Sequence, residues 1–203
     1  MVQSKHKVFI SYYHFDDQFY KESLLEFNDE HDIFIDMSID TGDIDENLDD
    51  QEIREIIRDD YLRDSTVTIV LVGTETKKRK HVDWEIYSSM YDGTVNKKSG
   101  VLAINLPSTG CTSHTAAHGD EEKSLIYPNS TWTTLKTRTE YESRYPHMPD
   151  RIIDNLLKNG AKVSVTSWDK LTLTNLRFLI DETYNDRADC NYDLSSNMRR
   201  SNS

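Results

Sequence analysis

The feature that most constrains the fold of this chain is a repeated alternation of short apolar runs with amphipathic segments. The apolar runs are rich in β-branched residues, and none approaches the ~18 apolar residues that a membrane-spanning helix needs. They are Val8–Ser11, Ile33–Asp36, Val67–Val72, Val101–Leu106 and Val163–Val165. We therefore expect five strands and no transmembrane segment.

The segments between these runs have a helical period. In Phe15–Asn28, the residues Phe15, Phe19, Leu24 and Phe27 are expected to lie roughly along one buried face. Further helices are predicted over Asp50–Leu62, His81–Tyr91, Pro149–Asn159 and Asp169–Asp186. Apolar strands separated by helices are typical of a parallel sheet covered on both faces, so the predicted fold class is α/β, with a doubly wound sheet.

The chain has 203 residues, which indicates a single domain (1–203) with an elaborated carboxyl half. Residues 107–145 are rich in Ser, Thr, Gly and His and exceed an ordinary connection, so we interpret them as an insertion. Residues 146–190 are expected to form the last helices and the last strand. Residues 191–203 are expected to be a disordered tail.

Charge and the amino-terminal segment limit the partners and the location of the protein. Lys and Arg number 24 against 36 Asp and Glu, for a net charge of −12, which disfavours binding to nucleic acid or to an anionic membrane. The first residues, Met1–Lys7, lack the apolar stretch of a secretory signal. We therefore expect a cytoplasmic location.

The glycines exclude two common nucleotide-binding classes. The seven glycines form neither a dinucleotide-binding fingerprint nor a phosphate-binding loop after any predicted strand. A Rossmann dehydrogenase and a P-loop ATPase are thus disfavoured. In doubly wound folds ligands bind beyond the carboxyl ends of the strands, which points to the segments after Ser11, Asp36, Val72 and Leu106.

Three segments carry a resemblance to a known family. Lys7–Asp17 is a strand that ends in Ser11, followed by an aromatic turn and acidic residues. Asp32–Asp36 precedes the polar loop Met37–Leu48, and Val82–Ile86 opens a helix. Together, in this order, they resemble the TIR-domain family over residues 5–106, and most closely the TIR-like component of the bacterial Thoeris anti-phage system.

The resemblance implies a flavodoxin-like fold and cleavage of the bond between nicotinamide and ribose in NAD, with Glu85 as the catalytic residue. NAD would be the substrate, so no cofactor is expected. The product would be a cyclic ADP-ribose isomer, a second messenger for a separate effector, and self-assembly is expected on activation. In familiar members a Trp-Cys pair precedes the glutamate by four and three residues. Here His81 and Val82 hold those positions, and Trp84 adjoins the carboxylate.

The position of Glu85 on its helix fits a catalytic role. At 3.6 residues per turn, Glu85 lies about 60° from Val82 and about 100° from Ile86, at the border of the apolar face. A carboxylate there could hold ribose hydroxyls and stabilise the positive charge that develops as nicotinamide leaves. The alternative is that Glu85 only complements the dipole at the start of the helix.

Other residues near the expected strand ends are candidates for substrate binding. These are Phe9, Ser11, Tyr12, Tyr13, His14, Asp36 and Trp84. Aromatic rings could stack on nicotinamide or adenine, although such rings are equally core residues, and alternation along the strand prevents all of them from reaching one ligand. Asp36 could orient the site or cap the following turn.

Two further motifs leave alternatives open. The basic run Lys77–Lys80 could contact the pyrophosphate of NAD or a neighbouring subunit, or it could be a solvated loop. Cys111, His114 and His118 have the spacing of zinc ligands, but a fourth ligand is not obvious, and we predict no metal.

Two other functions compete with an enzyme. The first is a non-catalytic TIR interaction module that uses the Met37–Leu48 loop as its contact surface. The second is a phosphorylated receiver domain. That reading requires paired acidic residues at the end of the first strand, where this chain has Ser11, Tyr12 and Tyr13.

Overall fold

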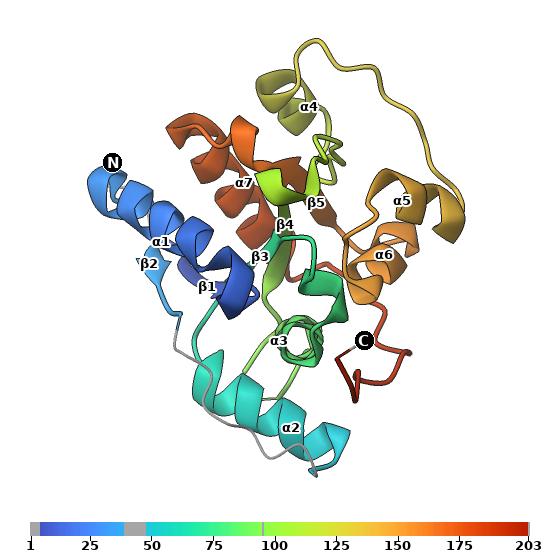
Figure 1. Cartoon of the computed structure of the whole chain (residues 1–203). Coiled ribbons are helices and arrows are strands. Elements are labelled where there is room, and N and C mark those ends of the chain that lie inside the picture. Colours follow the sequence, from blue (N-terminus) through green and yellow to red (C-terminus); the bar gives the residue numbers. More distant parts are fainter. Residues whose placement is uncertain (1–4, 39–47, 95, 203) are drawn as a thin grey trace.

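Five parallel strands form the centre of the molecule. The structure is a computed structural model, which describes residues 5–38, 48–94 and 96–202. In this part of the chain one sheet has the order β2-β1-β3-β4-β5 (Figure 1). The strands are β1 (Lys7–Ser11), β2 (Ile35–Asp36), β3 (Val67–Val72), β4 (Gly100–Asn105) and β5 (Val163–Ser167). This strand order is the flavodoxin-like one, and it confirms the predicted doubly wound α/β fold.

Helices cover both faces of the sheet, as Figure 1 shows. The α-helices are α1 (His14–His31), α2 (Asp50–Ile56), α3 (Lys80–Met90), α4 (Asp120–Ile126), α5 (Arg138–Arg144), α6 (Asp150–Leu157) and α7 (Leu173–Asp186). Shorter helical turns are η1 (Ile57–Tyr61), η2 (Thr76–Lys78), η3 (Pro107–Thr109) and η4 (Trp168–Lys170). None of the described helices is long and apolar enough to cross a bilayer.

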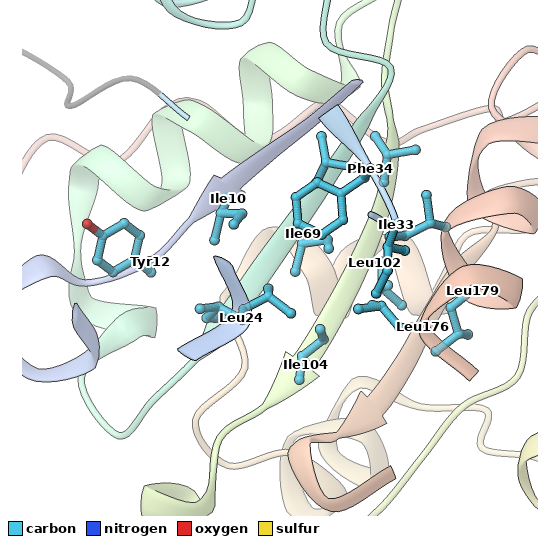
Figure 2. Close-up of a cluster of buried hydrophobic side chains, with 14 of the residues drawn as sticks. Ile10, Tyr12, Leu24, Ile33, Phe34, Ile69, Leu102, Ile104, Leu176 and Leu179 are labelled. Atoms are coloured by element: carbon cyan, nitrogen blue, oxygen red, sulfur yellow. The ribbon is translucent and has the colours of Figure 1, made fainter. Parts of the chain in front are cut away.

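The alternation of side chains along the strands supplies one core to each face. On one face, side chains of β1, β3 and β4 pack against α1 and α7 (Figure 2). The labelled residues of this cluster include Ile10, Ile69, Leu102, Leu24, Leu176 and Leu179. On the other face, α3, α5 and α6 pack against β3, β4 and β5, and α2 packs against β1. Every residue of β3 and β4 is buried, because helices cover both sides of these strands.

The buried face of α1 differs from our prediction. Phe15 is 86% and Phe19 70% exposed, whereas Leu24, Asp17 and Asn28 are buried. At 100° per residue, Phe15 lies about 180° from Leu24, but Asp17 lies only about 20° from it. The prediction that Phe15 and Phe19 face the core was therefore wrong. Polar Asn28 is accommodated because its side chain accepts hydrogen bonds from the backbone N–H groups of Ile33 and Phe34.

Residues 107–145 wrap around the β5 edge of the sheet. They contain η3, α4 and α5, and Thr115 forms an antiparallel bridge with Val165 of β5. Tyr141 and Tyr145 from this region join the core cluster under α3 and α6. The segment thus packs against the main core.

The carboxyl-terminal segment also differs from our prediction of a disordered tail over 191–203. Asp193 N donates to Asn155 Oδ1 over 2.7 Å, and Tyr192 Oη accepts from Val101 N over 3.2 Å. Met198 is buried in the cluster of Phe9 and α2. Residues 191–202 are held because three apolar side chains and several backbone groups find partners in the domain; the side chains are those of Tyr192, Leu194 and Met198.

Candidate active site

Glu85 and Ser11 meet at the carboxyl end of β1. Helix α3 packs on the sheet through Val82, Ile86 and Met90, and this packing turns Glu85 inward. Ser11 is the last residue of β1, and its Oγ donates a 2.6 Å hydrogen bond to Glu85 Oε2. Glu85 is only 5% exposed. The fold therefore brings together two residues that lie 74 positions apart in the sequence.

Burial controls the ionisation of Glu85. Loss of hydration raises the pKa of this carboxyl from its ordinary 4.5 to about 8, although the hydrogen bond from Ser11 favours the charged form. At pH 7 Glu85 is therefore mainly neutral in this conformation. A nearby cation would lower the pKa of Glu85 and restore its negative charge. A strongly shifted carboxyl at the strand ends of an α/β fold is typical of a functional site.

A second buried carboxyl, Asp17, lies at the carboxyl end of the neighbouring strand β3. Burial raises the pKa of Asp17 to about 6, and a hydrogen bond from Thr76 Oγ1 opposes this shift. Thr76 Oγ1 also accepts from the backbone N–H of Gly73, directly after β3. A Cβ added at Gly73 would lie 2.7 Å from Asp17 Cγ. Glycine is thus needed here because the Asp17 carboxyl occupies the space of a side chain.

Phe9 and Trp84 lie in the core. Both belong to a cluster with Ile53 and Met198, and both are almost completely buried. The indole Nε1 of Trp84 donates to the carbonyl oxygen of Arg199 over 2.8 Å. These two rings therefore pack behind the strand end and have no exposed face in this conformation.

The turn between β1 and α1 carries three of the predicted binding residues. The Tyr12 ring packs in the core under α1, and its hydroxyl donates to Gln18 Oε1 over 2.6 Å. His14 is exposed and stacks on Tyr12 with 4.2 Å between the ring centroids. Tyr13 is half-buried, and the guanidinium of Arg79 lies 3.9 Å from its ring centroid. Tyr13 and His14 are thus the predicted aromatic residues that remain accessible to a ligand.

Asp36 lies at the other side of β1, on the edge strand β2. Its side chain is exposed, and Asp36 Oδ1 accepts a 2.9 Å hydrogen bond from the backbone N–H of Ser38. This bond is that of a turn cap, one of the two roles we considered for Asp36. Most of the polar loop Met37–Leu48, expected as a contact surface in the interaction-module hypothesis, lies outside the described residues.

The basic run Lys77–Lys80 finds its partners within the chain. Lys78 and Arg79 both pair with Glu75, at 2.8 and 3.1 Å. Lys77 Nζ donates to the carbonyl oxygen of Pro146, and Lys80 is buried. The Glu75 carboxylate thus offsets part of the positive charge of this run before α3.

The side chains of Cys111, His114 and His118 have separate contacts. His118 Nδ1 lies 2.8 Å from Asp186 Oδ2, whereas His114 stacks on Tyr127 with 3.9 Å between the ring centroids. Cys111 Sγ donates to the carbonyl oxygen of Arg144. Among the residues that the structure describes, no group of three or more His, Cys, Asp or Glu is arranged to hold a metal ion.

Comparison with known families places the strand-end site in context. The model of the TIR-like domain of Thoeris protein ThsB matches residues 9–110, just over half of the chain. The chain belongs to this family. The matched part of the TIR-like domain extends from β1 to η3, so it contains both Ser11 and Glu85. No curated protein matches the chain.

Residues outside the matched part of the TIR-like domain also hold α3 in place. Arg199 N donates to Asp83 Oδ2, and Asn202 Oδ1 accepts from the backbone N–H of Lys80 at the start of the helix. Arg151 of α6 forms two hydrogen bonds to the Asp83 carboxylate, at 2.8 and 3.0 Å. The carboxyl-terminal segment therefore caps the helix that carries Glu85.

Sequence reasoning missed Asp17 and this carboxyl-terminal contact. The acidic residues in the first turn of α1 were visible in the sequence. Asp17 lies only about 20° from Leu24 around the helix axis, and this angle was the signal that Asp17 is buried. For residues 196–202 we find no such signal, because their contacts with α3 depend on long-range packing. Asn202 lies 122 positions from its partner Lys80.

Proposed function

We propose that this protein cleaves NAD at the bond between nicotinamide and ribose, with Glu85 as the catalytic carboxylate. The observation that carries the proposal is the buried Glu85–Ser11 pair at the carboxyl end of β1, within a TIR-like domain of the Thoeris ThsB family. Ligands of open parallel sheets bind at this edge. A carboxylate held there is placed to act on the sugar of a bound nucleotide.

The raised pKa of Glu85 fits a substrate that is itself a cation. The nicotinamide ring of NAD carries a positive charge, which stabilises the ionised carboxylate as the two approach. Breaking the C–N bond transfers positive charge to the ribose, and the neighbouring carboxylate stabilises this oxocarbenium-like state. Ser11 fixes Oε2 through its hydroxyl hydrogen bond. The charge of Glu85 thus develops when substrate arrives.

The cleaved sugar is captured within the same molecule. A hydroxyl oxygen of the ADP-ribosyl group bonds to the anomeric carbon and releases a proton, while nicotinamide leaves with the electron pair of the C–N bond. The product is a cyclic ADP-ribose isomer. It acts as a diffusible second messenger for a separate effector in anti-phage defence.

Substrate access requires a change of conformation. Glu85 is almost fully buried, so NAD reaches it only after covering groups move. Activity of the resting protein is therefore low. We assign Tyr13 and His14 to the substrate entrance because both lie beside the end of β1 and are not fully buried. Phe9 and Trp84 act behind the site, by supporting the strand and the helix that hold Ser11 and Glu85.

Activation proceeds through self-assembly in the cytoplasm. Phe15 and Phe19 lie one turn apart on the outer face of α1, and both rings are mostly exposed. Neighbouring exposed aromatic residues are typical of an interaction surface. The location follows from the substrate and from the downstream effector, and no cofactor is required because NAD is consumed.

The competing function is a non-catalytic interaction module. The burial of Glu85 favours this alternative, since a carboxyl that never reaches substrate would have only a structural role. Product analysis separates the two functions. Wild-type protein is incubated with NAD in extract from infected cells and, in parallel, in extract from uninfected cells, and the nucleotides are identified by mass spectrometry.

The proposal predicts nicotinamide together with a nucleotide lighter by one water than ADP-ribose, in the infected extract. ADP-ribose as the sole nucleotide product would contradict the cyclisation step but not the cleavage. Unchanged NAD in both extracts would contradict the enzymatic function and leave the interaction module.

A further inference from the structure

A cavity lies at the carboxyl ends of β4 and β5. Its volume is about 280 Å³, and its walls include Asn105, Leu106 and Pro107 from β4 and η3, and Ser167, Trp168 and Asp169 from β5 and η4. This is the sheet edge at which ligands bind in open α/β folds. At ~4.8 Å per strand, β5 is about 14 Å across the sheet from β1, so the cavity is separate from Glu85.

A polar pair forms the floor of this cavity. Asn105 and Ser167 are partners in the parallel register of β4 and β5, so their side chains leave the sheet on the same face. Ser167 is 2% exposed, and its Oγ has no hydrogen-bond partner within the described part of the chain. Asn105 Nδ2 has a long 3.4 Å bond to Ser113 O. A buried hydroxyl without a partner is uncommon in folded proteins, and Ser167 is the residue with such a hydroxyl that also lines this cavity.

The walls of the cavity favour a flat and uncharged ligand. Leu106 and Trp168 follow the polar pair in the sequence and line the cavity; Leu106 is fully buried, and Trp168 is half-buried. The charged residue among those that line the cavity is Asp169, which disfavours phosphate and accepts hydrogen bonds from N–H donors. The volume lies near the lower end of the usual range for small-molecule sites, so it suits a single ring system better than a whole dinucleotide.

We propose that this cavity binds a nitrogen heteroaromatic ring, such as a free base or a pyridine amide. The ring lies against Trp168, and a ring or carbonyl acceptor receives the hydrogen bond of the Ser167 hydroxyl. Asp169 accepts from an exocyclic N–H group of the same ligand. This inference does not rest on NAD cleavage, because the cavity lies at β4 and β5, whereas Ser11 and Glu85 belong to β1 and α3.

Ligand-observed NMR tests the proposal with defined probes. Adenine and nicotinamide are titrated against the wild-type protein, and cyclohexanecarboxamide serves as a probe with an amide but without an aromatic ring. The variants are Ser167→Ala and Ser88→Ala, both of which remove a buried hydroxyl that has no hydrogen-bond partner in the described part of the chain. Ser88 lies in α3, so it is a matched control for folding. Glu85→Gln reports any binding of the ring at the Glu85 site.

We expect adenine, nicotinamide or both to bind wild-type protein with a Kd below about 10 mM, and cyclohexanecarboxamide not to bind. Ser167→Ala should weaken binding about threefold to tenfold, the effect of one neutral hydrogen bond. Ser88→Ala should bind as the wild type does. Three results would overturn the proposal: no binding of either aromatic probe, equal affinity in Ser167→Ala, or loss of binding only in Glu85→Gln.

Discussion

Replacing Glu85 by Gln should make the protein more stable at neutral pH. The folded pKa of Glu85 is about 8, and the ordinary value is 4.5. Between these values the folded protein retains a proton that the unfolded chain releases, so stability falls by about 1.4 kcal/mol per pH unit as pH rises. At pH 7 this difference in ionisation has lowered the free energy of unfolding by about 3 kcal/mol relative to acidic pH. Gln avoids this loss of stability, because its amide is neutral in both the folded and the unfolded chain.

Urea denaturation between pH 5 and pH 8 measures this effect. The free energy of unfolding of Glu85→Gln minus that of the wild type should increase with pH across this range, with a slope that decreases near pH 8. A constant offset is expected from the altered hydrogen bond with Ser11, so the pH dependence of the difference is the decisive quantity. A difference that does not change with pH would refute the ionisation argument.

A matched substitution controls for burial alone. Glu122 in α4 is fully buried, and its pKa is also raised. However, His118 N and Ser164 Oγ both donate to Glu122 Oε2, and these bonds favour the charged form. Glu122→Gln should therefore give a weaker pH dependence than Glu85→Gln. Equal dependence in the two variants would show that burial, rather than the particular surroundings of Glu85, sets the effect.

Three further predictions concern the surroundings of Glu85. Met198→Ala should lower the free energy of unfolding by about 2–4 kcal/mol, because it opens a cavity in the cluster under α2. A loss below about 0.5 kcal/mol in urea denaturation would contradict the packing of the carboxyl-terminal segment. Gly73→Ala should lower the free energy of unfolding by about 1–3 kcal/mol, because the added Cβ overlaps the Asp17 side chain. In the double variant, Asp17→Ala should relieve much of that loss. Strictly additive effects of the two substitutions would argue against the contact. Ser11→Ala removes the hydrogen bond that favours ionised Glu85, so the pH profile of NAD cleavage should move to higher pH. An unchanged pH profile would show that Ser11 does not affect the ionisation of Glu85.

The sheet and its covering helices could be predicted because their signals are local. β3 and β4 are continuous apolar runs, and α3 repeats apolar residues every four positions, so both follow from short-range periodicity. The position of Glu85 also followed, since 3.6 residues per turn places it beside Ile86 and Val82. The hydrogen bond between Ser11 and Glu85 was not predicted, because it depends on the order of the strands and on the packing of α3 as well.

The remaining parts depend on contacts that local patterns do not encode. Phe15 and Phe19 were placed on the buried face from the helical period of Phe15–Asn28, but the phase of α1 is fixed by Leu24. The carboxyl-terminal segment has no apolar periodicity, and its position depends on Met198 and on the hydrogen bond of Asn202 to α3. The shifted pKa of Glu85 arises from burial, which composition and spacing do not give.

The most direct test of the central claim is the rate of nicotinamide release from NAD in extract of infected cells. Wild-type protein, Glu85→Gln and Glu122→Gln are compared at equal concentration, after denaturation curves have shown that all three are folded. Wild type and Glu122→Gln should release nicotinamide at similar rates, and Glu85→Gln should reduce the rate at least 100-fold, roughly the smallest loss seen when a main charge-stabilising group is removed. Equal rates in wild type and Glu85→Gln would contradict the assignment of Glu85 as the catalytic carboxylate.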